Sequence, residues 1–119
     1  MTLSLKGPYG GAVVNQPDSA EPPPAIFYGE VKASAVFTAQ PGMVVTARMG
    51  DVVCGQTKVI EVDGLARYVI DVRAVTKYGQ AACGQVGGTI TFSIDEYDLS
   101  PTAIWDNTQI HELNLSPAR

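Results

Sequence analysis

Short apolar runs, separated by Gly, Pro and Asp, recur along the chain from Ile26 onward. Two runs, 67–72 and 89–94, follow a period of two, which is the pattern of a strand with one buried face. The residues expected on the inward faces are Tyr68, Ile70 and Val72 in the first run and Ile90, Phe92 and Ile94 in the second, with Arg67, Val69 and Asp71 opposite. No segment shows a sustained apolar stripe of helical period.

About seven such runs follow one another, within 26–37, 43–49, 52–62, 66–75, 89–97, 101–107 and 109–115. Asp63-Gly64 is a hairpin-type turn between two of them. Short strands at this spacing predict an all-β fold, an antiparallel β-sandwich of about seven strands. We expect this sandwich domain to span residues 26–119.

The first 25 residues differ from the rest. The stretch 15–24, "NQPDSAEPPP", holds four of the eight prolines, which favour extended, polyproline-like chain. Two short β-capable pieces, "TLSL" and "GAVV", precede it. We expect residues 1–25 to form an N-terminal arm with a Pro-rich linker. Either the arm is flexible or packs on its own domain, or it adds a strand to a neighbouring subunit.

Composition narrows the function classes. The chain has 119 residues, enough for one core, and a net charge of −4. Without a basic stripe and interleaved aromatics, nucleic-acid binding is not expected. No apolar run approaches the ~20 residues that span a bilayer, and the N-terminus does not resemble a secretory signal. No fingerprint of a hydrolase nucleophile, a P-loop or a Rossmann fold is present, so we expect neither an enzyme nor a cofactor.

The only two cysteines, Cys54 and Cys83, each begin the tripeptide Cys-Gly-Gln. With a single histidine, His111, they are too few for a zinc site, and no C-x-x-C redox motif exists. The sequences diverge after the tripeptide, so we expect each glycine to serve a turn or a close strand approach rather than a repeat. Two alternatives remain: two buried thiols, or a disulfide, which the paired count favours and which would indicate an oxidising location or a thermophilic source.

Between Tyr28 and Leu115 the strings "YGEVKASA", "PGMVVTARMGDVVCGQTKV", "GLARYVIDV" and "CGQVGGTITFSI" follow one another. In this order they resemble small extracellular β-sandwich modules of the prealbumin-like group, which includes carboxypeptidase-regulatory-like and CnaB-like domains. The resemblance implies a spacer, an adhesin, a pilus part or an accessory domain. CnaB-like domains often carry an isopeptide bond, for which Lys32, Glu61 and Asn114 would be the candidates. No diagnostic motif surrounds them, and solvated side chains explain them as well.

Two further groups have candidate chemistry. Asp95, Glu96 and Asp98 form an acidic run that fits either a Ca²⁺ site or a solvated turn. Tyr78, Tyr97 and Trp105 would form an aromatic platform for a glycan or an interface, although the Ala-Ile-Trp context favours a packed Trp105.

These observations predict a non-enzymatic structural or interaction module, displayed on a cell, filament or virion surface. We expect it to self-associate as a homo-oligomer joined by its N-terminal arm, or to contact other surface proteins. The alternative from another class is a carbohydrate-binding module. No metal, cofactor, nucleic-acid partner or membrane insertion is expected.

Overall fold

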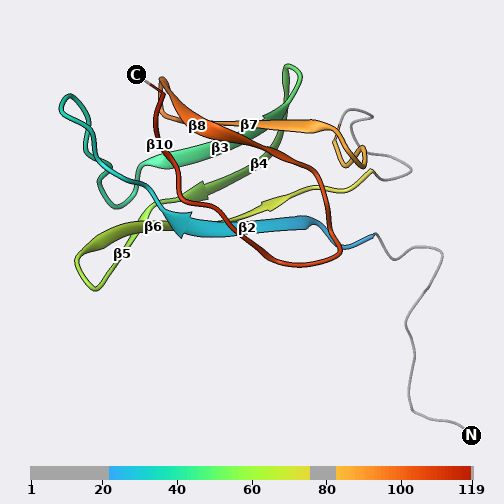
Figure 1. Ribbon diagram of the computed structural model, residues 1–119, viewed down its shortest axis with the longest axis horizontal. Helices are drawn as coiled ribbons and strands as arrows, with labels where there is room; N and C mark the ends of the chain where they lie inside the picture. Colours follow the sequence, from blue (N-terminus) through green and yellow to red (C-terminus); the bar gives the residue numbers. More distant parts are fainter. Residues whose placement is uncertain (1–21, 76–82, 119) are drawn as a thin grey trace, which may run out of the picture.

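The computed structural model describes residues 22–75 and 83–118, which form two layers of β-sheet (Figure 1). One sheet has five strands in the order β10-β8-β7-β3-β4: β3 (Val44–Met49), β4 (Val52–Lys58), β7 (Thr89–Ile94), β8 (Tyr97–Ile104) and β10 (Ser116–Pro117). The other has four in the order β5-β6-β2-β9: β2 (Ala25–Glu30), β5 (Ile60–Val62), β6 (Leu65–Val72) and β9 (His111–Glu112). No helix occurs in the described residues. The predicted all-β, two-layered fold is therefore confirmed.

The inward faces follow the predicted alternation. Tyr68, Ile70 and Val72 of β6, like Ile90, Phe92 and Ile94 of β7, are buried. The two sheets meet in the core, where the rings of Phe27 and Phe92 pack edge to face with centroids 5.8 Å apart. The hairpin turn at Asp63-Gly64 is also present, with φ values of 55° and 80° that suit this turn type.

The chain passes from one sheet to the other at two places where the sequence predicted a single strand. The run 52–62 divides at the buried Val59, whose carbonyl accepts a bond from Gly42 N, so that β4 and β5 lie in different sheets. The C-terminal run 109–115 contains β9 of the four-stranded sheet, and the chain directly after it forms β10 of the five-stranded sheet. These divisions raise the number of strands in the described residues to nine, against about seven expected.

The expectation of a purely antiparallel arrangement is wrong for one pair. β9 runs parallel to β2, because the chain returns along the sandwich after β8 before it reaches β9. The backbone then stays close to β2: Leu113 N donates to Tyr28 O at 2.7 Å, and a Cβ on Gly29 would overlap the carbonyl of Leu113. The hydroxyl of Tyr68 donates to the same carbonyl oxygen, and burial raises the pKa of this tyrosine.

The expected N-terminal arm up to residue 21 and the segment 76–82, which contains Tyr78, lie outside the described residues.

Candidate functional site

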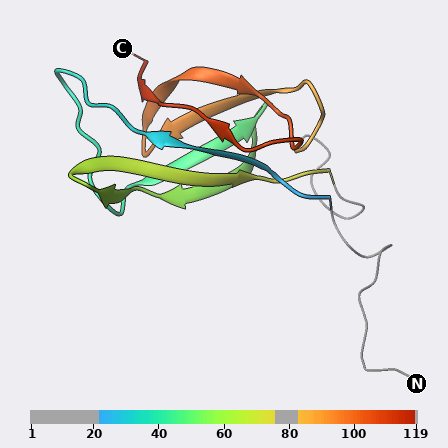
Figure 2. The ribbon, with the colours of Figure 1, turned by 60° about the horizontal axis from the view of Figure 1, so that its bottom comes forward.

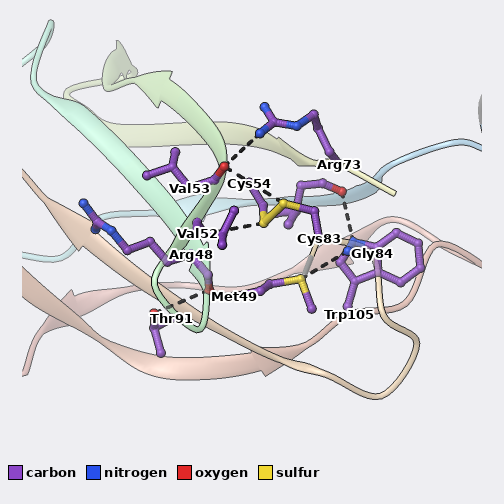
Figure 3. The surroundings of a disulfide bond; sticks show 11 residues. Arg48, Met49, Val52, Val53, Cys54, Arg73, Cys83, Gly84, Thr91 and Trp105 are labelled. Atoms are coloured by element: carbon purple, nitrogen blue, oxygen red, sulfur yellow. Dashed lines mark hydrogen bonds between the residues drawn. A yellow bond between two sulfur atoms is a disulfide. The ribbon is translucent and has the colours of Figure 1, made fainter. Parts of the chain in front are cut away.

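The disulfide joins Cys54 of β4 to Cys83, which precedes β7 (Figure 3). Both cysteines are fully buried, and their Cα atoms are 5.5 Å apart. The sequence alternative of a disulfide is therefore confirmed over that of two free thiols. In the chain-entropy model a loop of this length stabilises the folded state by about 3–4 kcal/mol. The bond anchors one end of the sandwich.

The shared Cys-Gly-Gln tripeptide has a steric explanation at its two glycines. A Cβ on Gly55 would overlap the carbonyl oxygen of Asp71 in β6, so β4 and β6 approach each other closely at this point. A Cβ on Gly84, which has φ of 82°, would overlap the backbone of Ala74 and Val75. Close backbone approach thus requires glycine in both tripeptides, as the sequence indicated.

Trp105 belongs to the core beside the disulfide rather than to the surface. Its indole is 2% exposed, and Nε1–H donates to the carbonyl oxygen of Val72 at 3.0 Å. Figure 3 shows the indole beside Gly84, near the disulfide. The neighbouring Gly84 N lies 3.3 Å from the sulfur of Met49. The expectation of a packed Trp105 is confirmed.

The other two candidate aromatics do not join Trp105 in the described structure. Tyr78 lies outside the described residues. Tyr97 is half exposed and packs against Phe37, with ring centroids 4.6 Å apart. Tyr97 opens β8, whereas Trp105 follows its last residue, so eight residues of extended strand, about 26 Å, separate them.

Asp95 and Glu96 of the acidic run form the exposed turn between β7 and β8, and Asp98 is an exposed residue near the start of β8. Within 22–75 and 83–118, Asp95, Glu96 and Asp98 do not belong to any cluster of three or more groups suited to a metal ion. The isopeptide candidates Lys32 and Asn114 are also exposed, and the Asn114 side-chain oxygen accepts a bond from Glu30 N at 2.9 Å.

Asp106, the next acid along the chain, forms a polar cluster with two later residues. Its Oδ1 accepts bonds from the backbone N and the hydroxyl of Thr108, at 3.0 and 2.8 Å. Its Oδ2 lies 3.3 Å from Nε2 of His111, whose ring stacks on Phe27. The bonds from Thr108, and then the nearby His111, lower the pKa of Asp106. Because His111 stacks on Phe27, this cluster holds the chain that follows β8 against β2.

A shallow polar hollow of about 290 Å³ lies on the outer face of the five-stranded sheet. Hydroxyl side chains line it together with Arg48 and Asp98, and a guanidinium nitrogen of Arg48 donates to the Ser93 hydroxyl at 3.0 Å. Hydroxyls, a cation and a carboxylate can exchange hydrogen bonds with a polar ligand such as a sugar. The only aromatic residue in its lining, Phe92, is buried in the core and offers no exposed ring for stacking.

The outer face of the four-stranded sheet is unlike this polar surface, because apolar side chains dominate it. We call it the β2–β6 face and define it by five exposed apolar residues, 38% to 54% accessible: Tyr28, Ile60, Val62, Leu65 and Val69. The strand register gathers them, since Tyr28 lies opposite Val69, and Val62 lies opposite Leu65. In Figure 2, where the lower layer turns toward the viewer, β2 and β6 lie side by side along this face.

Charged residues interrupt the β2–β6 face in a regular pattern. Along β6, Arg67 and Asp71 point outward on either side of Val69, and Glu30 of β2 lies opposite Arg67. The sequence already placed Val69 outward, but the face as a whole depends on the alignment of three strands. For that reason the sequence did not predict the β2–β6 face. The available signal was that apolar residues occupy both faces of the strand at 26–28.

No protein-family model matches the chain, and no curated protein or solved structure is detectably similar to it. Within the described ranges no helix is long and apolar enough to cross a membrane.

Proposed function

We propose that the protein is a non-enzymatic interaction module, displayed on the outer surface of a cell, filament or virion, that associates with copies of itself. The β2–β6 face carries this proposal. A group of exposed apolar side chains gathered on one face of a folded domain is typical of an interaction surface, because leaving them in water is unfavourable.

Two other features support the proposal. The buried disulfide suits an oxidising environment such as the cell exterior, where a structural cross-link persists. The segments 2–5 and 11–14 can add a strand to the edge of a neighbouring sheet, which would give association through backbone hydrogen bonds.

Sedimentation of the full chain tests self-association. We expect oligomers that grow with protein concentration, and a loss of the larger species when charges enter the arm in the variant Leu3→Asp/Leu5→Asp/Val13→Asp. A wild-type chain that stays monomeric up to about 500 µM would refute self-association. Antibody labelling of intact source cells or particles tests display, since a protein inside them would stay unlabelled until they are permeabilised.

A second function, glycan binding, is favoured by the polar hollow around Arg48 and Asp98. Binding on a glycan array that is lost in Arg48→Ala but kept in Lys32→Ala, which changes an exposed lysine outside the hollow, would establish it. A blank array would leave the interaction module as the sole proposal.

A further inference from the structure

We propose that the β2–β6 face packs against the same face of a second copy of this chain, with the two β6 strands antiparallel. This inference rests on the proposed self-association and specifies its surface, partner and geometry.

The charge order along β6 identifies a second copy as the partner. Its outward residues are Arg67, Val69 and Asp71, which place a cation and an anion at equal distances on either side of an apolar residue. When two such strands stack antiparallel with Val69 over Val69, each Arg67 lies over an Asp71 of the other copy. One two-fold axis therefore generates two ion pairs. The charge pattern of the face is therefore complementary to that of a second copy. An unrelated partner would need a matching pattern of its own.

The same charges reject the other two-fold arrangement. With the axis along the strands, Arg67 would lie over Arg67 and Asp71 over Asp71, so both contacts would be repulsive. In the antiparallel arrangement Glu30, which lies opposite Arg67 on β2, is a second carboxylate beside the same guanidinium. Glu112 of the short outer strand β9 lies at the rim, where water and salt screen it.

Within the described residues of its own copy, Arg67 also lacks an ion-pair partner, and its Nε lacks a hydrogen-bond partner. Its Nε is buried and has no hydrogen-bond partner, and within the described structure its guanidinium forms no ion pair, even with Glu30 across the sheet. A carboxylate is the strongest acceptor available to a guanidinium. Asp71 of a second copy would bind the Nη atoms of Arg67, whereas the buried Nε, which the chain's own atoms cover, stays out of its reach.

The size of the face predicts a weak dimer. The eight residues of β6 extend about 26 Å, and four strands at about 4.8 Å spacing are about 19 Å wide. Because β5 and β9 have only three and two residues, each copy would contribute at most about 500 Å², or about 1,000 Å² in total, at or below the low end of specific interfaces. We expect a dissociation constant of roughly 10–100 µM.

Sedimentation of the full chain from about 1 to about 500 µM tests the proposal. We expect a monomer–dimer equilibrium that weakens between roughly 0.05 and 0.5 M NaCl. Val69→Glu, which places two carboxylates against each other at the axis, should weaken dimerisation at least about tenfold. The matched control is Val36→Glu, at a residue 76% exposed and outside the face, which should leave dimerisation unchanged.

A charge exchange tests the register. Arg67→Glu and Asp71→Arg should each weaken the dimer, because each creates like-charged contacts. The double variant recreates both ion pairs with their signs exchanged and should restore part of the lost dimerisation, because Glu30 of β2 then lies beside a carboxylate at position 67. Circular dichroism confirms that each variant is folded. Because these residues are partly or fully exposed, a folded double variant that remains monomeric overturns the antiparallel register.

The remaining outcomes separate this inference from the proposed function. If the oligomer persists in Val69→Glu but is lost when Leu3, Leu5 and Val13 become Asp, the arm alone carries assembly: self-association stands and the β2–β6 interface is wrong. If the arm variant dimerises normally while Val69→Glu does not, the interface stands without the arm. A wild-type monomer at all concentrations overturns both.

Discussion

Removing the indole of Trp105 should be among the most destabilising changes in this domain. The side chain is 2% exposed, and a buried tryptophan removes about 200 Å² of surface from water. At about 25 cal/mol per Å² this corresponds to about 5 kcal/mol, an upper value because the unfolded chain already buries some of that area. We therefore expect Trp105→Ala to lower the free energy of unfolding by about 3–5 kcal/mol.

Trp105→Phe separates the hydrogen bond from the packing. Phenylalanine keeps most of the apolar ring but cannot donate to Val72 O, which then stays buried without this partner. The expected loss is about 1–3 kcal/mol. The control Ile104→Ala changes the residue before Trp105, which is 55% exposed, and should change stability by less than about 0.5 kcal/mol.

Urea unfolding followed by far-UV circular dichroism measures these differences. Fluorescence is unsuitable for the variants because Trp105 is the only tryptophan. If Trp105→Ala lowered the unfolding free energy by less than about 1 kcal/mol, the indole would not be packed as described. If Trp105→Ala does not fold, the smaller loss of unfolding free energy expected for Trp105→Phe still tests the packing of the indole.

Three further predictions concern the bonds and contacts around the core. The denatured, unreduced protein should show no free thiols, and reduction of Cys54–Cys83 should lower the unfolding free energy by about 3–4 kcal/mol in urea titrations; two free thiols would contradict the disulfide. Gly55→Ala should cost at least about 2 kcal/mol, because its Cβ would overlap a carbonyl oxygen of β6, and an unchanged urea midpoint would contradict that close approach. Because the pKa of Asp106 is lowered by folding, its contribution to stability is present above its unfolded pKa of about 3.9 and is lost as pH falls through the folded value. Thr108→Val should raise the Asp106 pKa toward its usual value in an NMR titration, whereas an unchanged pKa would show that Thr108 is not its main partner.

Local patterns in the sequence were sufficient for the inward faces of two strands and for one turn. The alternation in 67–72 and 89–94 predicted the buried residues correctly, because side chains in a strand alternate between its faces without reference to the partner strand. The turn at Asp63-Gly64 was equally local, since both residues tolerate positive φ.

Features that depend on distant segments were predicted less well. The run 52–62 gave no sign of its division at Val59, because an apolar residue at a sheet-to-sheet crossing continues the strand pattern. The parallel pairing of β9 with β2 was missed since the direction of a strand depends on the path that returns to it.

The sequence by itself determined the β class and the inward residues of β6 and β7, because these follow from residue type and local spacing. For Cys54 and Cys83 the count favoured a disulfide but left two buried thiols open, and only the fold brings the two cysteines together. Only the tertiary structure decided which glycines meet another backbone, that Trp105 faces Val72, and that Tyr28, Ile60 and Val69 share one surface. Those relationships depend on strand register and sheet order, which place residues far apart in the chain within contact distance.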